Sequence, residues 1–153
     1  MFNMKLHSFK GGIFPKERKE ISRDCPITKA FPLSKTVTIP VTMGGAPNTP
    51  LVKPGDKVAA GQIIANGDKF MNCPVHSSIS GTVKKITKCV VTGNAEVPCI
   101  VIESDGENRV ALMDKLNPFT CSFNKAIERI KNAGITGMEG ASFPAHVKLI
   151  PPP

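Results

Sequence analysis

The chain has no tryptophan, no tyrosine and only eight phenylalanines among its 153 residues. No stretch approaches the roughly 18 consecutive apolar residues that a membrane-spanning helix requires, and the opening MFNMKLHSFK lacks the apolar core of a secretory signal. The five cysteines contain no CxxC pair or other close metal-ligand spacing. The sequence therefore predicts no transmembrane helix and no metal site held by this chain alone.

Acidic residues are scarce at the start of the chain. Residues 1–36 contain eight of the twenty Lys and Arg residues but only three of the twelve Asp and Glu residues. Repeated Gly and Pro residues interrupt this segment, so residues 1–35 are predicted to form a basic extended arm that could meet an acidic partner or an anionic membrane face. Without a recognition-helix motif or paired base-stacking aromatics, nucleic acid is not expected as a partner.

Long periodic helices are also absent from the first two thirds of the chain. Residues 36–106 alternate short apolar runs with turn residues, a pattern typical of short strands. Because of Pro40, the β-branched run Thr36–Val41 is predicted to be an edge strand or the end of a strand. Gly93-Asn94 predicts a turn before the strongest strand, Val97–Ser104. The sequence therefore predicts a compact β domain over residues 36–106.

The period changes after this domain. Apolar residues recur at helical spacing behind Ser122, a suitable N-cap, and Gly134 is a suitable stop; these apolar residues are Phe123, Ala126, Ile127, Ile130 and Ala133. A glycine loop follows, in which Ser142 and Pro144 are predicted to cap and open a second helix. We interpret residues 107–153 as a helix and a glycine loop that open a truncated domain, because the sequence stops as this second helix begins.

Four strings, taken in order, resemble the C subunit of the Rnf complex (RnfC), a membrane-associated NAD:ferredoxin oxidoreductase. They are GGIFP at 11–15, GAPNTPLVKPGDKVAAGQIIA at 45–65, PVHSSISGTV at 74–83 with IVIESDG at 100–106, and GITGMEGASFPAHVKL at 134–149. The resemblance implies a mainly β chain: a biotinyl/lipoyl-like barrel-sandwich hybrid domain, followed by the start of an α/β domain that binds FMN and NADH.

The same resemblance implies other subunits of a membrane electron-transport complex as partners and a peripheral position on the cytoplasmic side of the membrane. In the family, later domains carry two [4Fe-4S] clusters on tandem CxxCxxC runs, and this sequence contains no such run. We therefore expect no cofactor to be bound by this segment alone, and no catalytic residue is assigned in it. A stand-alone interaction or carrier-like module without redox chemistry is the alternative.

The glycine loop resembles the family's flavin loop, GxGGAGFPTxxK. By this resemblance Gly137, Gly140, Phe143 and Lys148 are the candidate FMN-binding residues. Backbone N–H groups of such a turn, followed by a helix N-terminus, suit a phosphate. Glu139 and Ser142 replace family glycines, and a carboxylate at 139 would oppose a phosphate unless it pairs, for example with Lys148. The alternative interpretation is a helix-capping turn without a ligand.

Three other residue types invite a chemical role. His76 lies between Val75 and two serines, and we expect it to satisfy backbone groups of a turn rather than to activate a nucleophile. Cys73 and Cys99 lie in or near predicted strands and are expected to be small buried hydrophobes. In lipoyl domains a lysine at a hairpin tip is modified. The run from Gly61 to Lys69 is shorter than the corresponding run of those domains and Gly67 interrupts the strand, so Lys69 is expected to be an ordinary surface lysine.

Lys69 should therefore remain unmodified when the chain is co-expressed with lipoate and biotin ligases. Intact-mass measurement with peptide mapping tests this expectation, and Lys53, another lysine of the same β domain, serves as the internal comparison. A mass gain mapped to Lys69 alone would establish the carrier-like alternative.

Overall fold

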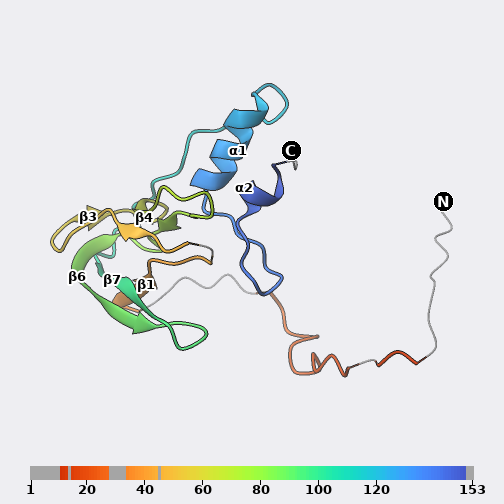
Figure 1. Cartoon of the computed structure of the whole chain (residues 1–153). Coiled ribbons are helices and arrows are strands. Elements are labelled where there is room, and N and C mark those ends of the chain that lie inside the picture. The colour runs from red at the N-terminus through yellow and green to blue at the C-terminus, as the bar shows by residue number, and fades with distance from the viewer. Residues whose placement is uncertain (1–10, 14, 28–33, 45, 151–153) are drawn as a thin grey trace. The chain divides into compact units, whose positions relative to one another are not determined.

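The computed structural model describes residues 11–13, 15–27, 34–44 and 46–150, and it divides the chain into two units, Met1–Phe31 and Pro32–Pro153 (Figure 1). In the first unit, residues 15–27 are all exposed. A turn forms where the N–H of Arg23 donates to the carbonyl of Lys19 at 2.8 Å. The described part of the predicted arm thus offers its basic side chains to solvent.

The larger sheet of the second unit is antiparallel and has the order β1-β7-β6-β3. Its strands are β1 (Thr36–Pro40), β3 (Lys57–Val58), β6 (Gly81–Val90) and β7 (Glu96–Ser104). The turn between β6 and β7 has positive φ at Gly93 (83°) and Asn94 (58°), which suits a tight hairpin. The predictions of a β1 edge strand, of the turn and of a strong last strand are confirmed.

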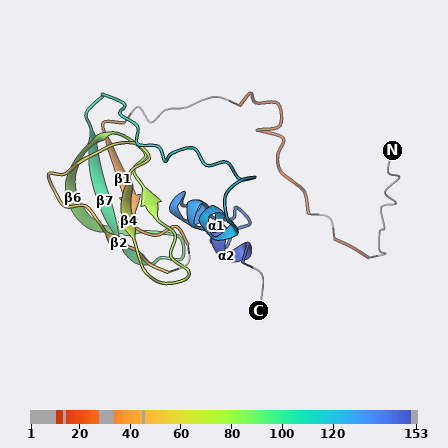
Figure 2. The same ribbon diagram turned by 90° about the horizontal axis from the view of Figure 1, so that it is seen from above.

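The smaller sheet has the order β2-β4-β5 and consists of β2 (Thr49–Pro50), β4 (Ile63–Asn66) and β5 (Val75–His76). Figure 2 shows the larger sheet curling around the core from above. The core is aliphatic, because β-branched residues from both sheets point inward; it comprises Val41, Val58, Ile64, Ala65, Val75, Ile79, Val83, Ile100 and Ile102. The prediction of a mainly β fold is confirmed.

Two buried asparagines join the loop between β1 and β2 to the loop between β4 and β5. Asn72 is completely buried, and its Nδ2 donates to the Asn48 Oδ1 at 3.0 Å and to the carbonyls of Ala46 and Pro47 at 3.0 and 2.8 Å. Its Oδ1 accepts from the Lys69 N–H at 2.6 Å. Asn48 in turn donates to the carbonyls of Val41 and Cys73. The side-chain amides therefore replace sheet hydrogen bonds where the backbone turns.

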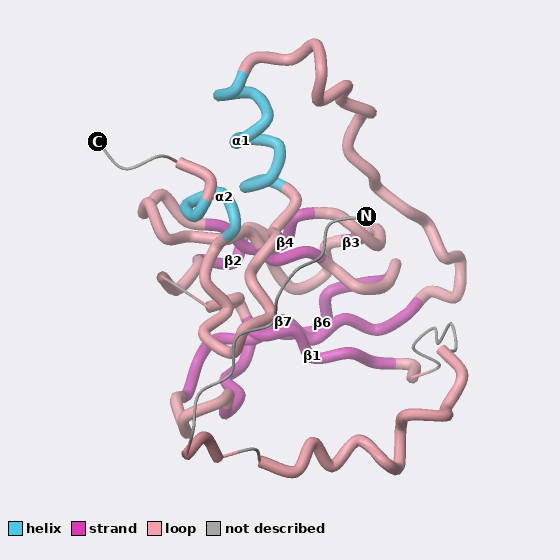
Figure 3. Tube along the Cα trace, turned by 90° about the vertical axis from the view of Figure 1, so that its right-hand side faces the viewer, coloured by secondary structure: helices cyan, strands magenta, loops and turns pink. Residues whose placement is uncertain are grey.

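Two helices follow: α1 (Phe123–Asn132) and α2 (Ala145–Lys148). In Figures 1 and 3 they lie beside the smaller sheet. Ser122 caps α1 by accepting from the Lys125 N–H, and Gly134 follows the helix with φ 67°, as predicted. The predicted cap of α2 is wrong: Pro144 is its N-cap, and Ser142 adopts a left-handed backbone with φ 49°. None of the described helices is long and apolar enough to span a bilayer.

Replacing Asn72 by alanine should lower the free energy of unfolding by about 3 kcal/mol, because it removes a fully buried side chain and leaves one backbone N–H and two carbonyls without their partner. The exposed Asn124 of α1 is the matched control, and its replacement by alanine should change stability by less than about 0.5 kcal/mol. Urea unfolding followed by far-ultraviolet circular dichroism measures both, since the chain has no tryptophan. Equal losses in the two variants would contradict a special role for Asn72.

Candidate functional site

Two of the strings that carried the resemblance, SGTV and IESDG, meet at one end of the larger sheet. Gly81 lies opposite Ser104, and a Cβ at Gly81 would overlap the Glu103 carbonyl, so only glycine fits there. Beside it the Ser80 hydroxyl donates to Asp105 Oδ1 at 2.6 Å. This hydrogen bond, together with the Arg109 guanidinium, lowers the pKa of Asp105 to about 2. The two strings therefore join the start of β6 to the end of β7.

His76 does not serve a local turn, contrary to the prediction. Its Nε2 lies 3.0 Å from the carbonyl of Asn132, the last residue of α1, and donates to it because a carbonyl can only accept. Gly134 packs closely against Pro74 and His76. A Cβ on Gly134 would lie 2.6 Å from the Pro74 carbonyl oxygen and 2.9 Å from the His76 ring. The neighbouring Ser77 does satisfy a turn, since its hydroxyl donates to the Ile79 carbonyl at 2.7 Å. His76 and Gly134 thus join α1 to β5.

The glycine loop between the helices is a closed turn. The Gly137 N–H donates to the Phe143 carbonyl and the Ala145 N–H to the Ile135 carbonyl, at 2.8 and 2.9 Å. Gly140, with φ 102°, has a backbone that an L-residue rarely adopts. These two bonds close the loop on itself.

Lys148, the candidate phosphate ligand, is paired with the residue that would oppose a phosphate. Its Nζ lies 2.6 Å from Glu139 Oε2, and the hydrogen bond and charge of Lys148 lower the pKa of Glu139. The pair lies against Gly137, where a Cβ would overlap both the carboxylate and the ammonium group. Of the candidate residues, the fold thus brings Gly137 and Lys148 together, and Glu139 contacts both.

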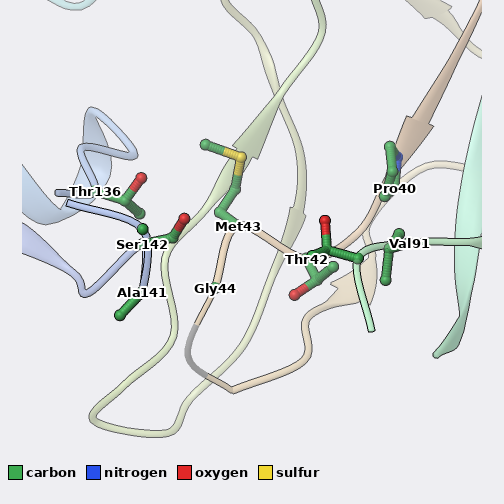
Figure 4. A pocket seen from close by; sticks show the side chains of 10 residues that line it. Pro40, Thr42, Met43, Gly44, Val91, Thr136, Ala141 and Ser142 are labelled. Carbon is green, nitrogen blue, oxygen red and sulfur yellow. The ribbon is translucent and has the colours of Figure 1, made fainter. Parts of the chain in front are cut away.

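Gly140 faces a different feature, a partly open depression of about 390 Å³ (Figure 4). The loop after β1, the β6–β7 turn and the glycine loop line it together. At its edge, Gly44 approaches Ser142 so closely that a Cβ on Gly44 would lie 2.6 Å from the Ser142 carbonyl oxygen. Threonine and serine hydroxyl groups and the apolar Pro40, Met43 and Val91 line the depression, and none of its described lining residues is charged.

These residues do not fit a flavin phosphate as they stand. Lys148, at the end of α2, is already paired with Glu139, and Ser142 occupies a left-handed position that glycine adopts at no cost. Phe143 contributes its carbonyl to the turn, but its side chain is exposed. Residues 34–44 and 46–150 contain no group of three or more potential metal ligands. Cys73 and Cys99 are fully buried, as predicted, and burial raises the pKa of both thiols.

Replacing Ser142 by glycine should raise the free energy of unfolding by about 0.5–1 kcal/mol, because it relieves the left-handed strain while increasing the entropy of the unfolded chain. Replacing it by alanine should give no gain, since alanine also has a Cβ. Gly140→Ala is the control in the opposite direction. Gly140 has φ 102°, which alanine adopts only with strain, so this variant should be less stable. Thermal unfolding of the three variants tests the assignment, and a stabilised alanine variant would refute it.

The comparisons with known proteins agree with this architecture. A family model described as the RnfC barrel sandwich hybrid domain matches residues 7–107. The chain is 40% identical to the C subunit of the proton-translocating ferredoxin:NAD(+) oxidoreductase complex of Clostridium ljungdahlii, over 97% of this chain and 33% of that protein. It is 38% identical to the Na(+)-translocating counterpart of Acetobacterium woodii, over 99% of this chain and 34% of the relative.

A third relative is the C subunit of the ion-translocating oxidoreductase complex of Haemophilus influenzae, 37% identical over 95% of this chain and 23% of its own length. The chain thus spans about a third or less of these relatives. The two-sheet β domain is the barrel-sandwich hybrid that the resemblance implied, which confirms that prediction. Since the family model covers most of the chain, the protein belongs to the RnfC family.

Proposed function

We propose that the chain serves as the N-terminal segment of the C subunit of an ion-translocating ferredoxin:NAD oxidoreductase complex. One observation carries the proposal: the similarity to subunits of such complexes continues over 95% or more of the chain. The family model of the barrel-sandwich domain ends at residue 107. The similarity to these subunits continues beyond that residue and therefore includes the helices and the glycine loop. In this role the barrel-sandwich domain scaffolds the electron-transfer subunit and docks it peripherally at the cytoplasmic side of the membrane.

The basic arm supports the docking part of the proposal. Lys16, Arg18 and Lys19 are exposed, and the ion pair of Lys19 with Glu17 at 3.8 Å lies in solvent and is weak. Lys10 lies outside the described residues. Residues 15–27 expose four basic and three acidic side chains, and the whole segment 1–36 carries eight basic against three acidic residues. A net surface charge speeds association with an oppositely charged surface and loses this effect as salt screens it.

Reversing the charges of Lys10, Lys16, Arg18 and Lys19 should weaken association with the membrane partner subunits mainly at low ionic strength. Co-purification with the complex at several salt concentrations measures the effect. Reversal of four β-domain lysines, Lys53, Lys57, Lys85 and Lys88, is the matched control with an identical change in net charge. An arm variant that associates as well as the control at every salt concentration would remove the arm from the docking surface.

For the glycine loop we propose a degraded flavin-phosphate turn: it matches the family loop at four positions, but its cation, Lys148, is paired with Glu139, so that it does not retain FMN as it stands. The proposal rests on the match of Gly137, Gly140, Phe143 and Lys148 to the family loop and on the 2.6 Å contact of Lys148 with Glu139. A flavin also needs a cleft that encloses its ring. FMN, [4Fe-4S] clusters and NADH would then be bound by a complete subunit. The carrier-like alternative is less well supported, because hydrogen bonds at Lys69 and Phe70 anchor the loop that contains Lys69.

The purified 153-residue protein should accordingly be colourless and should lose FMN on dialysis. Introducing Glu139→Gly and Ser142→Gly together should increase FMN retention, because the first change frees Lys148 and the second restores the glycine. Visible absorption and flavin fluorescence after dialysis give the bound fraction, and Lys148→Ala in the double variant should abolish the gain. Stoichiometric FMN on the unmodified chain would refute this account, and an unchanged double variant would leave the loop as a helix-capping turn.

A further inference from the structure

The loop between β4 and β5, residues 67–74, is one of the points at which the helical segment contacts the β core. From the core side, Asn72 and Asn48 fix it through buried amide hydrogen bonds. From the other side, the ring of His146 on α2 reaches its Phe70 carbonyl, 76 residues away in sequence. The same short loop thus has a partner in the core and a partner in the helix that carries Lys148.

His146 is well suited to hold this position. Its side chain is only 3% exposed, and Nε2 lies 3.1 Å from the Phe70 oxygen, to which it donates. Its Nδ1 is buried and has no hydrogen-bond partner in the described residues. The bond to Phe70 is therefore the polar contact that orients the ring.

Helix α2 needs such an anchor. It is a single turn of four residues without a side-chain cap, and a turn this short does not form on its own in water. Lys148 is its last residue, and the 2.6 Å contact with Glu139 joins the helix end to the glycine loop. A displacement of α2 would therefore move Lys148 relative to Glu139 and Gly137.

We propose that His146 is a positioning residue: by anchoring α2 to the Phe70 carbonyl, it transmits the geometry of the β core to Lys148 and the glycine loop. The chain of contacts runs from Asn48 and Asn72 through the loop at 67–74 to His146 and then along α2. This inference goes beyond the proposed function, because the position of Lys148 is set in this way whether or not the loop receives a flavin phosphate.

Two amide variants test the proposal. In His146→Gln the side-chain nitrogen reaches about as far as Nε2 and can donate to Phe70, whereas in His146→Asn it is one methylene too short. Both remove the imidazole and both bury an amide, so they differ mainly in reach. We expect the glutamine variant to behave like the unmodified protein and the asparagine variant to loosen α2.

Amide hydrogen exchange of the full chain, resolved by mass spectrometry, gives the first readout. In His146→Asn, peptides within residues 134–150 should exchange about threefold to tenfold faster, the effect of losing one hydrogen bond, while β6 and β7 remain protected. Site-resolved acylation of lysines gives the second. The rate at Lys148 should rise severalfold, and the rate at Lys84, which pairs with Glu103 at 2.7 Å in the larger sheet, should stay constant as the internal reference.

Equal exchange and equal Lys148 acylation in the two variants would overturn the proposal. So would faster exchange of β6 and β7 together with residues 134–150, because His146 would then support the whole fold rather than the position of α2. Neither readout involves FMN, so a failure of the flavin-turn proposal leaves this result interpretable. A protein that binds FMN while the two variants remain indistinguishable would conversely refute only the role of His146.

Discussion

The hydrogen bond between the side chains of Asn72 and Asn48 is the contact on which the rest of the second unit depends. Neither the loop after β1 nor the loop after β4 continues a sheet, and each places one asparagine side chain in the interior, where unpaired polar groups are costly. The two amides satisfy those groups and fix the loops to each other. The loop after β4 can therefore present the Phe70 carbonyl to α2 at a fixed place.

Close backbone approaches complete this arrangement and explain three glycines in physical terms. Gly81 lets β6 approach the Glu103 carbonyl, Gly134 lets the chain leave α1 against the Pro74 carbonyl, and Gly44 lets the loop after β1 contact Ser142. Ser142 differs from these glycines, because it carries a side chain and still adopts a left-handed backbone. In the same loop, Glu139 is paired with Lys148 at 2.6 Å.

Much of the fold could be predicted from the sequence because its signals are local. The Pro40 edge strand, the Gly93-Asn94 turn and the Ser122 cap each depend on residues a few positions apart. The Glu139–Lys148 pair was foreseeable as well, since opposite charges flank one short loop.

The contacts that locate the site could not be predicted in this way. His76 with Asn132 and His146 with Phe70 join residues 56 and 76 positions apart, and no periodicity records such pairs. We expect residues 134–150 and residues 63–76 to form one cooperative unit through these contacts. Native-state hydrogen exchange at increasing urea concentration tests it most directly. Residues 134–150 and residues 63–76 should lose protection in the same transition; early loss of 134–150 while residues 63–76 and 81–104 stay protected would contradict it.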